Sequence, residues 1–506
     1  MSLKKTILAN YLGQGWAALM GLAFVPVYVD YLGIEAYGLI GVFAILQAWL
    51  TLLDMGMAPT LSREMARFTA GVVSAQSIIN LLRSIEVFCV ATALIMCLII
   101  WAISGWLAEG WLNTNELPFE LVTKSIQIMA LLIAARFMES LYRSALIGLQ
   151  KQVWYNAVNA ALATLRSVGA VMVLAWYAPT IYAFFLWQLL VSCLTTFVLA
   201  LGVHRRIDVP QLSARFSRMA LIDIFDYARG MAIIVLLSLL LTQIDKILLS
   251  RMLSLDAFGI YTLAATVSGA LYVLITPITT AIYPRLVELL SRQESAALVL
   301  TYHRGAQILT IITAPGAFIL MLFGDGVVFA WSGDANLSLA VGPILSVLAI
   351  GTLLNGMMTF PYILQLAYGW TSLTIRINVV AVSLIVPLIL WSVPLYGSIG
   401  AAWVWFFMNS AYVLIGAQLM YRNLLNDEKW KWYMHDLAGP AIGALSVLFI
   451  FYIFRPTGLT DRWHWLVFLL LAIVLTSMGA VIGSTQVRSL MLQAIRRLNP
   501  ATDKCS

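Results

Sequence analysis

The chain has 506 residues, of which 62% are hydrophobic and 10% are charged, and its mean hydropathy is +0.92. A soluble domain carries about 25% charged residues, so this composition excludes an ordinary soluble protein and predicts a chain that lies mostly in lipid. The formal net charge of +7 would also suit a nucleic-acid partner. Its placement in alternate loops argues against nucleic acid and for a membrane topology.

Apolar stretches of about 20 residues, the length that crosses the hydrocarbon core as a helix, recur from end to end. On this criterion we count about fourteen, which predicts an all-α polytopic membrane protein. In chain order they cover residues 7–31, 37–60, 86–108, 120–148, 155–177, 180–203, 222–248, 257–283, 305–330, 338–365, 371–393, 398–421, 437–455 and 463–484.

Basic residues predict the orientation of these spans. With the N-terminus inside, roughly 22 of the 30 Lys and Arg lie on the cytoplasmic side or at the adjoining helix ends, as the positive-inside rule expects. The loop with Glu109, Glu116 and Glu120 then lies outside. Both termini are therefore expected in the cytoplasm. Lys4 and Lys5 lead into a first span that is too long for a cleaved signal peptide.

Two sequence patterns occur twice, at similar offsets. The decapeptide YLGIEAYGLI, ending at Ile40, is matched by MLSLDAFGIY, ending at Tyr261. The second pattern is Ile181, Ala183 and Trp187, matched by Ile399, Ala401 and Trp405. Repeats of this kind predict two similar helical bundles in tandem, as in transporters that bind a substrate between their halves.

The repeats and the polar stretches divide the chain into five predicted segments. An N-terminal six-helix lobe covers residues 1–204 and a C-terminal six-helix lobe covers 222–424. The linker 205–221 mixes Arg with Leu, Phe and Met, which is typical of a helix on the membrane surface. An extra pair of helices covers 425–485, and a cytoplasmic tail covers 486–506.

Ionisable residues within the spans are the strongest chemical signal. Each costs about 2.5–3.5 kcal/mol at a helix centre, so it should face a cavity or another charge. Arg166 lies about 16 Å into its helix at 1.5 Å per residue, near mid-membrane. It is a candidate substrate contact, unless it pairs with Asp54 or Glu86 on another helix. Arg136 is similarly deep, and it can either contact substrate or pair with Glu139 three residues on.

Four further residues complete the predicted site. Arg229 and Lys246 are expected to add to a cationic cavity, and Asp54 and Asp245 are candidates for binding a coupling proton or sodium ion. Either aspartate could instead pair with an arginine on another helix. Spans eight to fourteen contain almost no deep charge, so the first lobe is expected to supply most of the charged wall.

Several classes of function lack their sequence signals. There is no Walker A sequence, so the chain is not expected to be an ATP-driven pump. The four His are scattered, which predicts no metal site, and no nucleophilic or acid–base constellation predicts an enzyme or a cofactor. An integral-membrane polymerase or glycosyltransferase would need a large outer loop, and no such loop is present.

The chain resembles the polysaccharide-transporter (Wzx-type) flippases of the multidrug/oligosaccharidyl-lipid/polysaccharide (MOP) exporter superfamily. The resemblance spans most of the chain and depends on short elements in a fixed order around the helices. These are Tyr37-Gly38, Asp54 and Gly56 with Arg63, Gly148-Leu149-Gln150, Gln243 with Asp245-Lys246, and Phe258-Gly259 with Tyr261 and Ala264.

This resemblance implies two six-helix bundles that form a V and open alternately to each side of a bacterial inner membrane. The implied substrates are undecaprenyl-pyrophosphate-linked oligosaccharides, flipped as precursors of O-antigen or exopolysaccharide. A polysaccharide polymerase and a chain-length regulator are the implied partners, and a monomer is the expected functional form. The extra helix pair is similar to that of lipid II flippases, which are one alternative. A multidrug cation antiporter of the same superfamily is another.

Overall fold

The computed structural model describes residues 3–49, 57–207, 216, 236–237, 239–456, 458 and 461–485. All of their named secondary-structure elements are helices, and the β-pairing recorded among them is one isolated bridge between Asn113 and Ser254. The predicted all-α class is therefore confirmed. The chain divides into two compact units, residues 1–259 and residues 260–506, which we describe separately.

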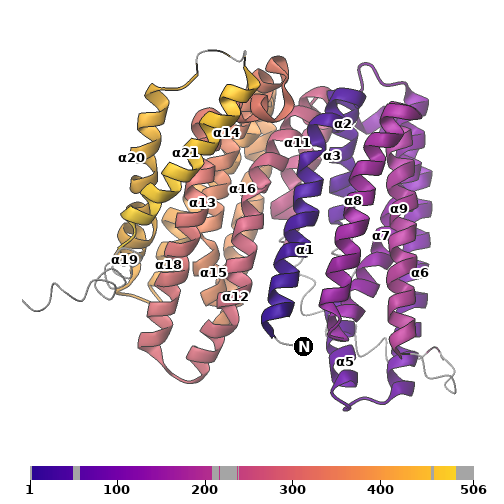
Figure 1. Cartoon of the computed structure of the whole chain (residues 1–506), viewed down its shortest axis with the longest axis horizontal. Coiled ribbons are helices and arrows are strands. Elements are labelled where there is room, and N and C mark those ends of the chain that lie inside the picture. Colours follow the sequence, from indigo (N-terminus) through magenta and orange to yellow (C-terminus); the bar gives the residue numbers. More distant parts are fainter. Residues whose placement is uncertain are drawn as a thin grey trace, which may run out of the picture. The chain divides into compact units, whose positions relative to one another are not determined.

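In the first unit, most consecutive helices are joined by short connections (Figure 1). In order they are α1 (Leu3–Ala23), α2 (Val25–Leu32), α3 (Ile34–Ala48), α5 (Met57–Thr69), α6 (Ala75–Trp106), the π-helical turn η1 (Leu107–Trp111), α7 (Phe119–Gly148), α8 (Gln152–Trp176) and α9 (Ile181–Ile207). Residues 239–252 form a further helix of this unit. The following helix, α11 (Leu255–Gly269), begins in the first unit and ends in the second.

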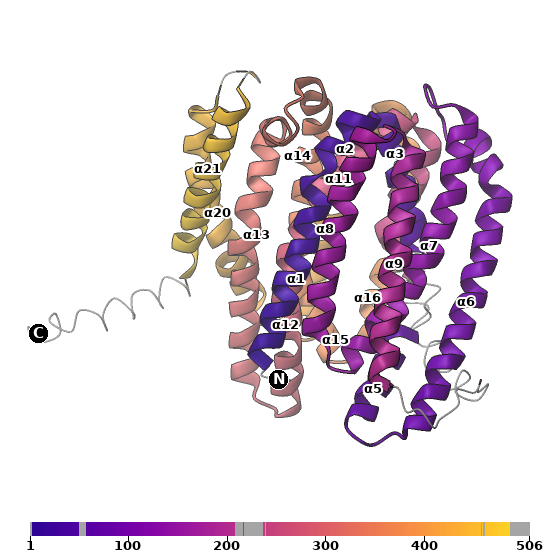
Figure 2. The same cartoon turned by 45° about the vertical axis from the view of Figure 1, so that its right-hand side comes forward.

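The second unit has longer helices and contains the chain's C-terminal helix pair. Its elements are α12 (Leu271–Ser291), α13 (Ser295–Ser332), α14 (Ala335–Met357), α15 (Thr359–Ala367), α16 (Thr371–Tyr396), α17 (Ser398–Ala411), η2 (Tyr412–Gly416), α18 (Ala417–Tyr421), α19 (Lys429–Lys431), η3 (Trp432–Ala438), α20 (Gly439–Ile453) and α21 (Arg462–Gly483). The last two lie side by side in both views (Figures 1 and 2).

Twelve of the predicted spans are recovered among the described residues as helices that are long and apolar enough to cross a membrane. The chain is thus a multi-pass membrane protein. The other two predicted spans, residues 37–60 and 222–248, overlap stretches outside the described ranges. The predicted linker 205–221 and tail 486–506 also lie mostly outside them. The total of fourteen therefore stays a prediction.

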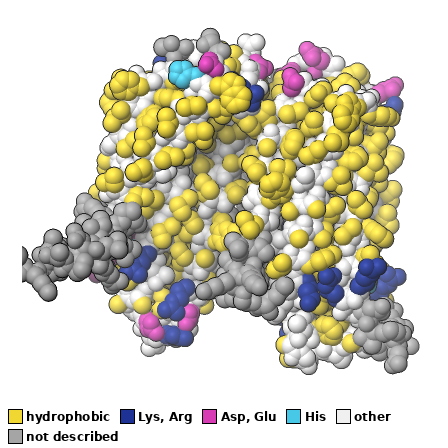
Figure 3. All heavy atoms as spheres, viewed as in Figure 1, with side chains coloured by type: hydrophobic (Ala, Val, Ile, Leu, Met, Phe, Trp, Pro, Cys, Tyr) yellow, Lys and Arg dark blue, Asp and Glu magenta, His cyan; other side chains and the backbone are white. Residues whose placement is uncertain are grey.

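In each unit, basic side chains gather at one end of the helices. Figure 3 shows Lys and Arg at this end of each unit, and hydrophobic side chains over the rest of its helices. In the first unit this end includes α5, which carries Arg63 and Arg67, and in the second it includes the α12–α13 turn, which carries Arg285 and Arg292 (Figure 1). Such an asymmetry is typical of the cytoplasmic side of a membrane protein.

The two copies of the repeated decapeptide pack against each other in the first unit. A Cβ atom on Gly38 would lie 2.5 Å from the Leu255 carbonyl oxygen, and one on Gly259 would lie 2.3 Å from the Ile34 carbonyl oxygen. Any larger residue at either position would push the two backbones apart. The repeat thus marks a close crossing of α3 and α11, which the sequence similarity alone does not reveal.

The loop between η1 and α7 joins these two copies on the side opposite α5. Glu35, near the start of α3, accepts hydrogen bonds from the backbone N–H groups of Asn115 (2.6 Å) and Glu116 (2.9 Å). The Asn115 side chain donates to Asp256 at 2.9 Å, and Asn113 donates to the carbonyl oxygens of Arg251 and Leu253. We call residues 111–116 the strap, because they bridge the starts of α3 and α11.

The C-terminal helices α20 and α21 form a tightly packed hairpin. Gly439 and Gly443 on α20 face Gly483 and Gly479 on α21, and a Cβ atom on Gly443 would lie 2.2 Å from the Gly479 carbonyl oxygen. Small residues four apart permit this close approach in membranes. The hairpin is tied to α13 by Arg462, which donates to the carbonyl oxygens of Ala330 (2.8 Å) and Trp331 (2.7 Å).

Candidate functional site: an arginine cluster in the first unit

Arg166 and Arg136 converge from α8 and α7 within the first unit. Arg166 Nη2 lies 3.6 Å from Glu139 Oε2, and these two side chains are 21% and 18% exposed. From the sequence we considered Glu139 as a possible ion-pair partner of Arg136, and Asp54 or Glu86 as possible partners of Arg166. The structure instead gives Glu139 to Arg166, because α7 and α8 are adjacent antiparallel helices. Asp54 lies outside the described ranges.

Glu86 belongs to a separate polar group. It accepts a hydrogen bond from the Tyr142 hydroxyl at 3.0 Å and lies 2.9 Å from His204 Nε2. Arg83, one turn earlier on α6, approaches the second carboxylate oxygen at 3.5 Å. These three contacts account for the buried Glu86 carboxylate, so the sequence-based pairing of Glu86 with Arg166 is wrong.

Arg136 is held by α3 rather than by an acid. Its Nη1 donates to Gln47 Oε1, and its guanidinium lies 5.0 Å from the centroid of the Phe43 ring. Gln47 and Phe43 are four residues apart on α3, so one face of that helix supplies both contacts. A neutral acceptor and an aromatic face orient the guanidinium without cancelling its charge.

Helix α9 fixes the position of the carboxylate. The Ser192 hydroxyl donates to Glu139 Oε2 at 3.2 Å, and the Thr196 hydroxyl donates to the Ala135 carbonyl oxygen at 3.0 Å. Ser192 and Thr196 are four residues apart, so they lie on the face of α9 that packs on α7. Three helices thus determine where Glu139 sits between the two arginines.

The cluster has more positive charge and more donors than its own partners use. The cluster contains two guanidinium groups but one carboxylate, and Arg143 lies one turn after Glu139 on α7, hydrogen-bonded to Tyr155 of α8. Within the described part of the chain, the buried Nε–H groups of Arg136 and Arg166 have no hydrogen-bond partner. Planar guanidinium donors suit the oxygens of carboxylates and phosphates, so this cluster can bind an anion.

The other predicted site residues are less informative. Arg229 lies outside the described ranges, as does Asp54. Asp245 and Lys246 are on the helix formed by residues 239–252, where Asp245 is 8% exposed and Lys246 is half-buried. The structure thus brings Arg136 and Arg166 together, while the roles of Lys246 and Asp245 stay predictions.

The sequence missed a buried ionic group in the second unit. His303 of α13 contacts Asp436 of η3 through Nδ1 and lies 3.1 Å from Glu428 through Nε2, and Asp436 is 1% exposed. Gln307 donates to Asp436 at 2.9 Å. The sequence predicted almost no deep charge in spans eight to fourteen and did not single out Asp436. The signal was the His303/Gln307 pair, two polar residues four apart on one helix face.

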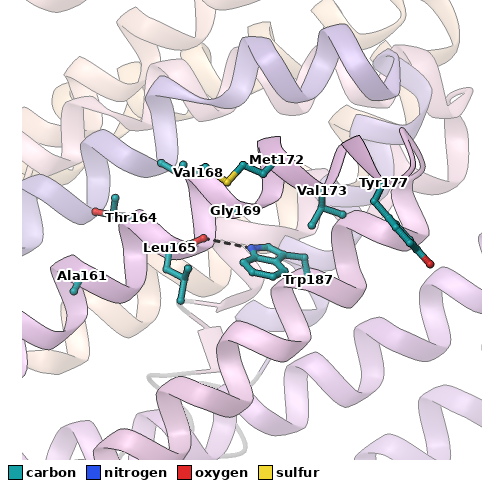
Figure 4. Close-up of a pocket in the computed structure, with 9 residues that line it drawn as sticks. All are labelled: Ala161, Thr164, Leu165, Val168, Gly169, Met172, Val173, Tyr177 and Trp187. Atoms are coloured by element: carbon teal, nitrogen blue, oxygen red, sulfur yellow. Dashed lines mark hydrogen bonds between the residues drawn. The ribbon is translucent and has the colours of Figure 1, made fainter. Parts of the chain in front are cut away.

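An apolar groove on the first unit is distinct from the arginine cluster (Figure 4). It has a volume of about 540 Å³ and lies between α8 and Trp187 of α9. The Trp187 indole donates to the Leu165 carbonyl oxygen at 3.4 Å and covers Gly169, where a Cβ atom would lie 2.2 Å from its ring. None of the described residues that line it is ionisable except Tyr177, and its walls are mostly apolar.

Solved structures with this arrangement of helices are transporters of the MOP superfamily. The lipid II flippase MurJ, in an inward closed conformation, is similar with a TM-score of 0.70 and 14% identity, over 96% of this chain and 99% of that one. An inward-facing MATE-family multidrug transporter of the same superfamily gives a TM-score of 0.61 and 13% identity, over 83% of this chain and 96% of that one. At these identities the similarity defines the fold. The chain therefore has a MOP-transporter fold.

The sequence defines the family more closely. The model of the polysaccharide biosynthesis protein family matches residues 3–290, more than half of the chain, and the chain belongs to that family. A putative O-antigen transporter of Shigella flexneri is 21% identical over 421 residues, which cover 83% of this chain and 97% of the relative. The resemblance inferred from the short sequence elements is confirmed.

Proposed function

We propose that the protein flips undecaprenyl-pyrophosphate-linked oligosaccharides from the cytoplasmic to the periplasmic leaflet of a bacterial inner membrane, without catalysing a reaction. The observation that supports this most directly is the Arg136–Arg166 cluster, which places two cations around one acid inside membrane-spanning helices. The family match and the Shigella relative support polysaccharide precursors as the substrate class.

The chemistry of the substrate explains why such a cluster is needed. A diphosphate that enters lipid unaccompanied loses its hydration at a prohibitive cost. Guanidinium groups replace water with charge-assisted hydrogen bonds, which are about twice as strong as neutral ones. The buried Nε–H groups of Arg136 and Arg166 have no partner among the described residues, and in this proposal they donate to phosphate oxygens once the site opens. The polyprenyl tail, in this proposal, stays in the bilayer.

The remaining parts of the proposal come from the sequence. Arg229 and Lys246 would extend the cationic wall, and Asp54 or Asp245 would bind a coupling ion. Two lobes would open alternately to the two sides of the membrane. The basic end seen in Figure 3 supports cytoplasmic termini. A monomer that works beside a polymerase and a chain-length regulator is the proposed functional form.

Complementation of a flippase-null strain tests this function. We expect Arg166→Ala and Arg136→Ala to abolish polysaccharide export at normal expression, because each removes a substrate-facing cation. Arg292→Ala, which removes an exposed arginine of the second unit, is the control and should export normally. Wild-type export by Arg166→Ala would contradict the role of the cluster. Failure of the wild-type chain in every O-antigen and exopolysaccharide host would contradict the function.

A lipid II flippase is the second candidate. One observation favours it: the similarity to MurJ extends over 96% of this chain, whereas that to the MATE transporter covers 83%. The C-terminal hairpin α20–α21 would account for part of the difference. Rescue of a strain that lacks its peptidoglycan-precursor flippase would identify this function. A cation antiporter is disfavoured, because two arginines to one acid would repel a cationic drug.

A further inference from the structure

A second cavity lies in the second unit, at the end of the helices opposite the α12–α13 turn. Its volume is about 600 Å³, and it lies where α13 ends, α14 begins and α21 begins. Its walls combine apolar side chains, among them Leu322 and Leu339, with two charged ones, Asp325 and Arg455. Neither charge belongs to the arginine cluster of the first unit.

Asp325 is an acid within a membrane-spanning helix. It lies seven residues before the end of α13 at Ser332, about 10 Å below that end at 1.5 Å per residue. Its Oδ1 accepts a hydrogen bond from the Gly326 N–H at 2.9 Å. Within the described ranges no Lys, Arg or His forms an ion pair with it. A carboxylate at this depth should face a cavity or a cation, and Asp325 faces a cavity that a cation can enter.

Two aromatic rings line the same cavity as this carboxylate. Phe323, where α13 leaves the helical conformation (φ −128°, ψ 30°), lines the cavity together with Trp465. The Phe323 ring centroid is 6.4 Å from that of Trp465 and 6.4 Å from that of Tyr452. A carboxylate and aromatic rings that line one cavity can together bind an ammonium group, since both attract a cation.

Arg455 supplies the opposite charge. It follows the end of α20, its side chain is exposed, and its guanidinium lies 5.0 Å from the centroid of the Tyr452 ring. No ion pair joins Arg455 to Asp325 or to another acid in the described part of the chain. One cavity therefore contains two opposite charges that do not neutralise each other.

We propose that this cavity binds the headgroup of a zwitterionic phospholipid with a primary ammonium group. The ammonium lies against Asp325 and the rings, the phosphate lies against Arg455, and the acyl chains follow the apolar wall of Leu322 and Leu339. An anionic headgroup would place a second negative charge near Asp325. A simple cation would leave Arg455 without a partner. The two charges together fit a zwitterion.

Native mass spectrometry of the full chain in detergent tests the proposal. The probes are phosphatidylethanolamine, phosphatidylglycerol and phosphatidylcholine, each added at equal concentration. We expect several-fold more phosphatidylethanolamine bound than either competitor, because only this lipid combines a hydrogen-bonding ammonium with a phosphate. Asp325→Asn should reduce its binding to the level of phosphatidylglycerol, and Arg455→Gln should also weaken it. Glu294→Gln, at an exposed acid of the same unit, should bind like the wild type.

Two results would overturn the proposal: equal binding of the three lipids by the wild type, or undiminished phosphatidylethanolamine binding in both Asp325→Asn and Arg455→Gln. Asparagine still offers Oδ1 to the Gly326 N–H, so we expect Asp325→Asn to fold. If it does not accumulate, Arg455→Gln, at an exposed position, decides the outcome alone. Lipid binding is measured without polysaccharide, so neither result bears on the proposed transport function.

Discussion

Glu139 sets the net charge of the arginine cluster. Its carboxylate contacts one guanidinium nitrogen of Arg166 at 3.6 Å, which is long for a charge-assisted pair, and it also accepts from Ser192. A bidentate ion pair would have shorter N···O distances and would use two N–H donors of Arg166. The Glu139 carboxylate thus lies where an anionic ligand would bind, and it leaves some N–H donors of the arginines without a partner. In the proposed function, a phosphate competes with it for Arg166.

The first prediction follows from this competition. Glu139→Gln should bind inorganic pyrophosphate at least about tenfold more tightly, a change of about 1.4 kcal/mol, because it removes a negative charge about 4 Å from the ligand position. Export should fall at the same time, since release becomes slower. Isothermal titration calorimetry measures the first effect and complementation the second. Glu120→Gln, at an exposed acid of the same helix, is the control.

Weaker pyrophosphate binding by Glu139→Gln would show that Glu139 only positions Arg166. No pyrophosphate binding by the wild type, with its export intact, would show that the cluster does not hold the diphosphate. These two outcomes separate the role of Glu139 from the function of the cluster.

Glu428 gives a second prediction at this scale. Burial raises the pKa of its carboxyl, but Lys431 at 2.9 Å and His303 at 3.1 Å outweigh this effect and hold the pKa below the ordinary value of 4.5. A carboxyl with a lowered pKa stabilises the fold above its unfolded-state pKa and loses this effect as the pH falls through its folded-state pKa. Stability that depends on Glu428 should therefore disappear only in acid.

The measurement compares unfolding temperatures of the wild type and Glu428→Gln in detergent from pH 7 to pH 3. We expect a gap that is constant above about pH 4.5 and closes below it. Asp427→Asn, at the neighbouring exposed acid, should show no gap at neutral pH. A gap that widens toward acid would contradict the assignment of these contacts to a charged Glu428.

At the scale of elements, the α20–α21 hairpin depends on glycine. Gly443 and Gly479 bring two backbones into direct contact, and Trp465 of α21 covers Gly326 of α13, where a Cβ atom would lie 2.0 Å from its ring. Arg462 satisfies carbonyl groups at the end of α13. The hairpin is therefore part of the core of the second unit, in which Trp432 and Trp465 are buried.

The third prediction tests this packing. Gly443→Leu should lower the unfolding temperature by several degrees, because overpacking a close contact costs about 1–3 kcal/mol. Gly21→Ala is the matched control, since a Cβ atom on Gly21 meets nothing within 4 Å. Thermal unfolding in detergent measures both. An unchanged unfolding temperature for Gly443→Leu would mean that the hairpin does not contribute to the stability of the unit.

The elements were more predictable than their partners. Hydrophobic length is a local property, so twelve spans follow from the sequence alone. Glu139 pairs with Arg166 rather than with Arg136 because of how α7, α8 and α9 pack, and no local sequence pattern encodes this packing. The same holds for Asp436, whose burial depends on contacts with His303 and Gln307 of α13.

At the scale of the whole molecule, the repeat is where the two halves of the sequence meet. The contact between the copies lies within the first unit, where α3 and the start of α11 cross at Gly38 and Gly259. The strap joins the same two elements through Glu35, Asn115 and Asp256. In the proposed alternating access, this end of the molecule faces the periplasm. A route to the periplasm between the repeats then requires the strap contacts to break in each cycle.

The fourth prediction concerns this opening. Asn113→Ala removes the donors to the carbonyl oxygens of Arg251 and Leu253, and Asn115→Ala removes the donor to Asp256. The double variant should increase, by several-fold, the labelling of a cysteine introduced at Ala257 by a membrane-impermeant maleimide, in a chain whose native cysteines are replaced. Asn423→Ala, which removes only a bond within its own helix turn, is the control. Equal labelling in the wild-type background and the double variant would show that the strap does not restrain the repeats. In that case the Gly38–Gly259 crossing alone would have to keep this side closed.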